Sequence, residues 1–150
     1  MKPSPVLFLD FDGVTHPEQC TSDKLFTCLP LIEDVLRRHE GVEVVISSSW
    51  RVHHPLEELR SYFSADMAHR VIDCTPILPR NEVEPAATRV RQRECLTWLD
   101  ANRPGRPWLA IDDVPWMFEV GCANLLLTNH RTGFSPTDAT HLQSVLGRLK

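Results

Sequence analysis

The chain has 150 residues, 42% of them hydrophobic, and a formal net charge of −4. This is the size of one ordinary domain with a sizeable core, so we expect a single domain over residues 1–150. The slightly acidic balance excludes a general attraction to nucleic acid or anionic membrane, although a local basic patch is compatible with it.

Cysteine content and hydropathy indicate the cellular compartment in which we expect the protein. The five cysteines are an odd number without C-x-x-C spacing, so neither a disulfide framework nor a zinc site is indicated. No apolar run has the length of a membrane span, and acidic residues follow the first apolar run at Asp10. We therefore expect a cytoplasmic protein without membrane association. A homo-oligomer is compatible with the sequence but is not indicated by it.

The first half of the chain alternates strand and helix patterns. Val6 to Leu9 is a short apolar run that is typical of a strand buried on both faces. Pro30 suits the first turn of a helix, which we expect to end at Gly41. A second buried strand is predicted over residues 42–46, and a short helix after Pro55. A brief strand at 70–72 and a proline-rich loop at 73–85 complete this half.

The second half continues the alternation. A longer helix is predicted over residues 86–102, ended by the Pro-Gly-Arg-Pro segment that follows. Strands are predicted at 108–111 and 124–128. Ser135, with Asp138 three residues later, is typical of a helix N-terminus. Alternating strands and helices predict an α/β fold, a three-layer sandwich around a doubly wound parallel sheet.

Three of the predicted strands end in polar residues. These residues are Asp10 with Asp12, Ser47 to Ser49, and Asp112 with Asp113. Ligands gather at the carboxyl ends of the strands in such sheets, so we expect one site there. Carboxylates and hydroxyls without a His/Cys cluster favour a hard cation, Mg²⁺ above all, together with a phosphorylated substrate.

The pair Asp10 and Asp12 suits phosphoryl transfer, with Asp10 as nucleophile and Asp12 as the acid that protonates the leaving oxygen. An EF-hand loop is excluded, because Val14 and Thr21 stand where oxygen ligands are required. Two solvated acids at an ordinary strand end are the alternative interpretation of this pair alone, and the polar ends of the other strands argue against it.

The segments LFLDFDGV, VEVVISSSWR and WLAIDDV resemble the first, second and fourth motifs of the haloacid dehalogenase (HAD) superfamily of aspartate-nucleophile phosphatases. More narrowly, the chain resembles small HAD domains of bacteria, phages and RNA-repair proteins. The resemblance implies a HAD/Rossmann-like fold, an aspartyl-phosphate on Asp10, and Asp12 as general acid/base. It also implies a Mg²⁺ ion held by the Asp10 side chain, the Asp12 backbone carbonyl and Asp112, with Asp113 as helper or alternative.

The resemblance leaves two phosphate-binding positions open. Ser47 directly follows the second strand, but alignment on Trp50 favours Ser48, which we place first. The third motif is a Lys or Arg, and the only lysines are Lys2, Lys24 and Lys150, so the cation must be an arginine. Arg91 is preferred. Arg93, Arg89 and Arg80 remain alternatives, and a solvated helix face is the simpler role for any one of them.

The chain has too few residues between its motifs for a full cap domain, the insertion that covers many HAD sites. In this family an uncapped site implies a large substrate or closure by another subunit. We therefore expect phosphorylated nucleic-acid ends or nucleotides first, and phosphoproteins behind them. Trp50 and Arg51 could contact a nucleotide, although core packing of Trp50 is as well supported. Alternatives to a phosphatase are a regulatory phosphoacceptor and a catalytically inactive binding module on the same fold.

Overall fold

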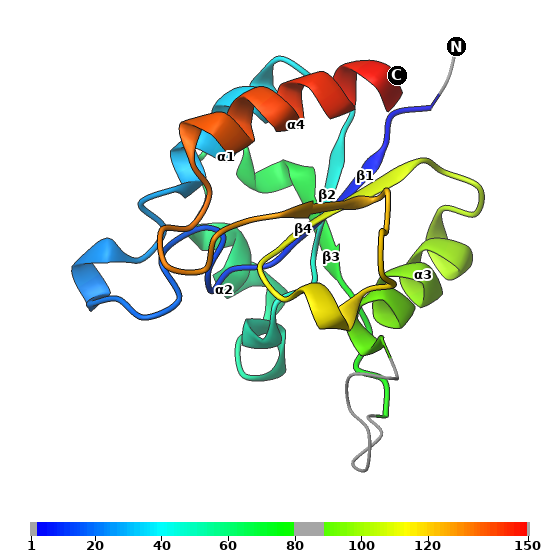
Figure 1. Ribbon diagram of the computed structural model, residues 1–150, viewed down its shortest axis with the longest axis horizontal. Helices are drawn as coiled ribbons and strands as arrows, with labels where there is room; N and C mark the ends of the chain where they lie inside the picture. Colours follow the sequence, from blue (N-terminus) through cyan, green and yellow to red (C-terminus); the bar gives the residue numbers. More distant parts are fainter. Residues whose placement is uncertain (1–2, 80–88, 150) are drawn as a thin grey trace.

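The computed structural model describes residues 3–79 and 89–149. Five parallel strands form one sheet in the order β3-β2-β1-β4-β5. The strands are β1 (Val6–Leu9), β2 (Glu43–Ile46), β3 (Val71–Cys74), β4 (Trp108–Asp112) and β5 (Leu125–Leu127). The helices are α1 (Leu29–Arg37), α2 (Leu56–Ser61), α3 (Val90–Asn102) and α4 (Pro136–Leu149). Figure 1 shows α1 and α4 side by side on one face and α3 on the other.

The central strand β1 divides the core by strict alternation. Leu7 and Leu9 pack into the cluster that includes residues of α1, α2 and α4, whereas Val6 and Phe8 pack against α3. All four side chains are fully buried, as expected for the middle strand of a sheet covered on both faces. The predicted three-layer α/β fold is confirmed, and within the described residues no inserted domain covers the sheet's carboxyl edge.

Helix starts follow the expected local chemistry. Pro30 lies in the first turn of α1, where its missing N–H costs no intrahelical bond. At α4, the Ser135 hydroxyl accepts the Asp138 N–H at 3.1 Å, and the Asp138 carboxylate accepts the Ser135 N–H at 2.9 Å. This reciprocal capping box confirms the predicted start of the last helix.

Several boundaries differ from the sequence prediction. The first helix, expected to end at Gly41, ends at Arg37. The third strand continues through Asp73 and Cys74, which were assigned to the loop. The Asp73 carboxylate accepts a hydrogen bond from the Trp98 indole N–H at 2.7 Å. This bond satisfies the polar side chain within the strand, whereas hydropathy alone predicted that the strand ends before Asp73. The longer helix begins at Val90, after Arg89 in a left-handed conformation. The predicted residues 80–85 of the loop and 86–88 of this helix lie outside the described residues.

Candidate active site

The acids of the first and fourth strand ends lie together where the strand order changes direction. Leu9 pairs with Ile111 in the β1–β4 register, so Asp10 and Asp112 follow as neighbours. Carboxylate oxygens of Asp10, Asp112 and Asp113 all lie within 4.8 Å of one another. The predicted convergence at the sheet's carboxyl edge is therefore present, at the switch point between β1 and β4.

Burial makes this acidic cluster electrostatically costly. Asp10 is 5% exposed and Asp112 is fully buried. Burial, and then the charge of Asp112, raise the pKa of Asp10 well above its usual range, while Arg91 opposes the rise. Burial also raises the pKa of Asp113. A divalent cation between these oxygens would relieve the repulsion, so the donor set fits a hard metal ion.

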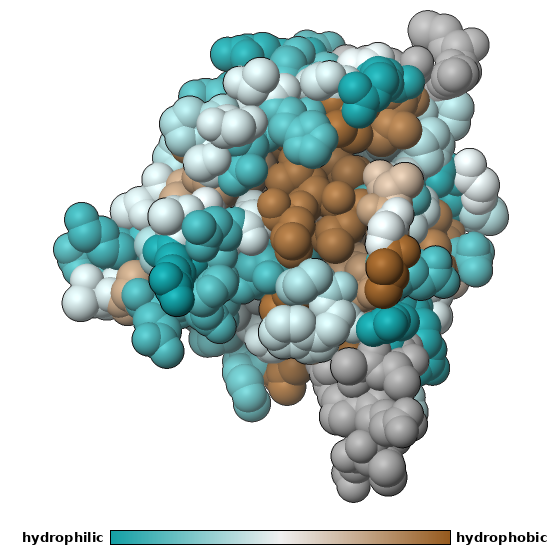
Figure 2. All heavy atoms as spheres, viewed as in Figure 1, coloured by the Kyte–Doolittle hydropathy of each residue, from teal (hydrophilic) through white to brown (hydrophobic). Residues whose placement is uncertain are grey.

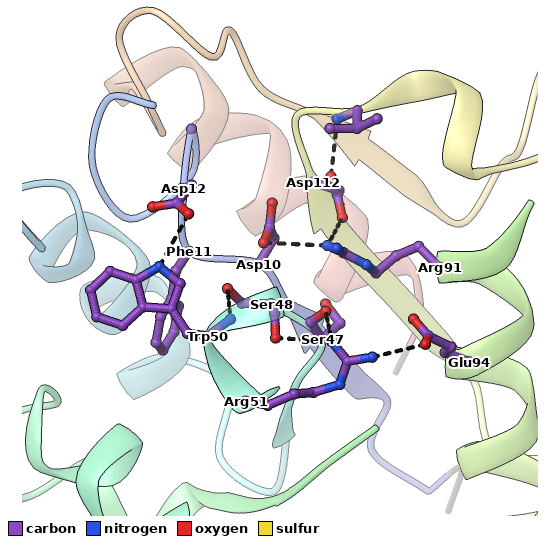
Figure 3. A network of polar contacts seen from close by, with 12 residues as sticks. Asp10, Phe11, Asp12, Ser47, Ser48, Trp50, Arg51, Arg91, Glu94 and Asp112 are labelled. Carbon is purple, nitrogen blue, oxygen red and sulfur yellow. Dashed lines mark hydrogen bonds and ion pairs between the residues drawn. The ribbon is translucent and has the colours of Figure 1, made fainter. Parts of the chain in front are cut away.

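Arg91 is the cation that the fold brings to the acids. Its Nη1 lies 2.9 Å from Asp112 Oδ2 and 3.3 Å from Asp10 Oδ1, and the side chain is almost fully buried (Figure 3). Arg93 is exposed, because two residues along a helix correspond to a rotation of about 200°. Arg89 donates to the Trp116 carbonyl instead, and Arg80 lies outside the described residues.

Asp12 is held apart from the acidic cluster. Its Oδ1 lies 2.9 Å from His16 Nε2 and its Oδ2 accepts the Trp50 indole N–H at 3.1 Å. The hydrogen bond from His16 lowers the pKa of Asp12, burial opposes this, and the bond from Trp50 adds to the lowering. The Asp12 side chain therefore lies outside the carboxylate cluster; its backbone carbonyl remains the predicted metal ligand.

Both candidate serines are buried at the end of β2. The Ser48 Oγ accepts the Trp50 backbone N–H at 3.2 Å, which makes Ser48 the N-cap of a 3₁₀ turn over Ser49–Val52. The carbonyls of Ser47 and Ser48 accept from Arg51 Nη1 at 3.1 and 3.0 Å. Arg51 also forms a buried ion pair with Glu94 at 2.9 Å, so its guanidinium is used inside the fold and not for a nucleotide.

Sequence reasoning missed His16 and the role of Trp50. His16 is 1% exposed in a loop, where no helical or strand period assigns it a direction. Its spacing of four residues from Asp12 was the only available signal, and outside a helix that spacing has no fixed geometry. The core packing expected for Trp50 is confirmed, because its ring packs against Phe11 and Phe26. The hydrogen bond from its indole N–H to Asp12 was not expected.

Comparison with known proteins identifies the family. The family described as the HAD domain in Swiss Army Knife RNA repair proteins matches residues 6–139. The chain belongs to this family. It is therefore a member of the HAD-type hydrolases, and the matched span covers both strand-end acid pairs, the serines and Arg91. No curated protein matches the chain.

The described part of the HAD domain contains no helix that is both long enough and apolar enough to cross a membrane.

Proposed function

We propose that this HAD domain is a Mg²⁺-dependent phosphomonoester hydrolase that acts through an aspartyl-phosphate on Asp10. The observation that carries the proposal is the placement of Asp10, which is buried against Asp112, Asp113 and Arg91 at the carboxyl edge of the sheet. Two solvated acids at an ordinary strand end would show neither this burial nor a buried cationic partner.

The proposed reaction has two displacements at phosphorus. An Asp10 carboxylate oxygen attacks the phosphoryl group, the bond to the ester oxygen breaks, and Asp12 donates a proton to the departing oxygen. Asp12 then takes a proton from water, whose oxygen attacks the aspartyl-phosphate. Inorganic phosphate leaves and the Asp10 carboxylate is restored.

Other residues of this chain bind and orient the phosphoryl group. Ser48 comes first, because its bond from Trp50 N–H uses an oxygen lone pair and leaves the hydroxyl proton for a phosphoryl oxygen. Ser47 is the alternative. Arg91 orients the buried Asp10 and opposes the rise of its pKa. Asp10, the Asp12 carbonyl, Asp112 and Asp113 would hold Mg²⁺, which when bound neutralises charge on the phosphoryl oxygens.

The surroundings of the site support one class of substrate. A groove of about 400 Å³ borders Asp113 and is lined by Glu18, Trp116 and His130, among others. The Trp116 side chain is 57% exposed, so a flat ring is available beside the acids. We propose phosphorylated nucleic-acid ends or nucleotides as substrates, since any base can stack on such a ring. The description of the family, a HAD domain in RNA repair proteins, supports this proposal of a nucleic-acid substrate.

The test is phosphate release by the wild-type protein with and without Mg²⁺. Substrates are p-nitrophenyl phosphate, nucleotides, and oligonucleotides with a 3′- or a 5′-phosphate. We expect activity that EDTA abolishes and Mg²⁺ restores. Asp10→Asn removes the nucleophile, so turnover should fall by about a thousandfold or more.

Asp100→Asn is the matched control, because Asp100 is an exposed aspartate of α3. It should leave turnover unchanged. Activity that survives Asp10→Asn would refute the nucleophile. A wild-type protein that turns over none of these substrates and binds no Mg²⁺ would instead support an inactive binding module. A stable phosphoprotein without turnover would indicate a phosphoacceptor.

A further inference from the structure

The carboxylate of Asp12 is held at both of its oxygens. His16 Nε2 lies 2.9 Å from Oδ1, and Trp50 Nε1 donates to Oδ2 at 3.1 Å. These partners come from separate segments, one from the loop after β1 and one from the 3₁₀ turn after β2. The Asp12 side chain is 45% exposed and without such partners would sample several rotamers. Figure 3 shows the Trp50 ring against Asp12 beside Asp10.

The direction of the His16 bond is set by the backbone. The Phe26 N–H donates to His16 Nδ1 at 3.3 Å, and a backbone N–H can only donate. Nδ1, which also lies 3.0 Å from Thr15 Oγ1, therefore accepts this hydrogen bond, and Nε2 is the ring nitrogen that faces Asp12. The ring is 1% exposed and lies edge-on to Phe26 at a centroid distance of 5.1 Å, so it has little room to turn.

Phe26 itself has an unusual backbone. Its φ of 62° is left-handed, a conformation that a bulky residue rarely adopts and that costs free energy. Ring packing holds it there, because Phe26 stacks on Tyr62 at 4.4 Å and meets Phe11 edge-on at 5.3 Å. The strained residue thus aims its N–H at His16. Strain of this kind persists where surrounding packing fixes it, and it is common at functional sites.

We propose that His16 and Trp50 are positioning residues that fix the Asp12 carboxylate for proton transfer to the leaving oxygen. The inference rests on the proposed phosphatase function. The inference assigns His16 no contact with substrate. Instead, the hydrogen bonds that run from the Phe26 N–H through His16 to Asp12 orient the proton donor, as hydrogen-bonded partners orient catalytic or metal-binding groups in other sites. A buried histidine that only supports the loop is the competing interpretation.

Leaving-group dependence separates the two interpretations. A poor leaving group such as an alkyl alcohol needs protonation as the ester bond breaks, whereas p-nitrophenolate departs with little help. A misplaced Asp12 should therefore harm alkyl phosphates far more than p-nitrophenyl phosphate. General loosening of the loop should harm both substrates alike.

The experiment measures kcat/KM on both substrates for His16→Phe, His16→Gln and Trp50→Phe, because kcat/KM reports phosphoryl transfer to Asp10 and not the later hydrolysis step that both substrates share. His16→Phe removes the donor and should lower kcat/KM on the alkyl phosphate about a hundredfold. Its effect on p-nitrophenyl phosphate should be much smaller. His16→Gln places an amide N–H near the position of Nε2 and should restore part of the loss. Trp50→Phe keeps an aromatic ring, removes the other donor, and should show a smaller effect with the same dependence.

Trp98→Phe is the matched control. The Trp98 indole also donates to an aspartate, Asp73, but from α3 to β3 and away from Asp12. This variant should leave the ratio of the two kcat/KM values unchanged. Should His16→Phe fail to fold, His16→Gln and Trp50→Phe still decide the question.

Equal losses on both substrates, in variants that fold, would overturn the positioning role. That result leaves the proposed function intact if Asp12→Asn still shows the leaving-group dependence and Asp10→Asn is inactive. A wild-type protein without phosphatase activity overturns both the proposed function and this inference.

Discussion

Gly13 lets the two strand-end acid pairs approach each other. A Cβ at this position would lie 2.2 Å from Asp113 Oδ2, and the residue has a φ of +77°, which side chains rarely adopt. The glycine of the D-x-D-G motif thus serves two purposes, a sharp turn after β1 and space for an acid that follows β4. The sequence indicated the turn, but the close approach to Asp113 required the structure.

We expect Gly13→Ala to push Asp113 away from Asp10 and to weaken Mg²⁺ binding. The positive φ should also cost about 1 kcal/mol of unfolding free energy. Mg²⁺ titration calorimetry and urea unfolding measure the two effects separately. Gly105→Ala is the control, because Gly105 has a φ of +76° with no atom within 4 Å of the added Cβ. It should show the backbone cost alone; equal Mg²⁺ affinity in both variants would contradict the steric role.

At the scale of elements, Arg51 connects the ends of β2 and β3 to α3 through hydrogen bonds and an ion pair. Its guanidinium donates to the carbonyls of Ser47 and Ser48 after β2 and of Thr75 and Pro76 after β3. It also pairs with Glu94 of α3, and the two side chains are 3% and 0% exposed. The segment that carries the candidate serines is therefore fixed by one buried cation.

Arg51→Met should lower the free energy of unfolding by about 3–5 kcal/mol. The change leaves the Glu94 charge buried without its partner and removes donors from several carbonyls. Denaturant unfolding measures the loss. Arg37→Met removes an ion pair with Asp66 at the surface and should cost far less, since water screens exposed pairs. Similar losses of unfolding free energy in the two variants would show that the buried ion pair stabilises the fold no more than the exposed one.

At the scale of the molecule, the site opens onto an apolar surface. Trp116 belongs to the groove beside Asp113 and to a second groove of about 500 Å³ that Leu125 and Leu127 of β5 also line. Figure 2 shows apolar side chains gathered on the face that carries β5. Within the described residues no insertion covers this region, in keeping with the large phosphorylated substrate that we propose.

Trp116→Ala should raise KM for a phosphorylated oligonucleotide about tenfold, because the loss of one base stack costs on the order of 1–3 kcal/mol. KM for p-nitrophenyl phosphate should change little. Steady-state kinetics on both substrates provide the test. Val120→Ala is the control, since Val120 lies on the same groove and is 92% exposed. An unchanged KM for the oligonucleotide would argue against a base on Trp116.

The sequence by itself determined the fold class and the edge of the sheet at which the acids meet. Those features depend on local patterns: apolar strands, strand–helix alternation, and polar residues at strand ends. It also required the third-motif cation to be an arginine, because no lysine lies between the second and fourth motifs.

Only the tertiary structure decided which side chains face the site. The buried face of α3 includes Arg91, Gln92 and Glu94 as well as apolar residues, so hydrophobic periodicity could not orient this helix. Likewise, the partners of Asp12 come from a loop and a turn, where sequence spacing fixes no direction. Contacts between segments far apart in the chain depend on how whole elements pack, and no local pattern encodes that packing.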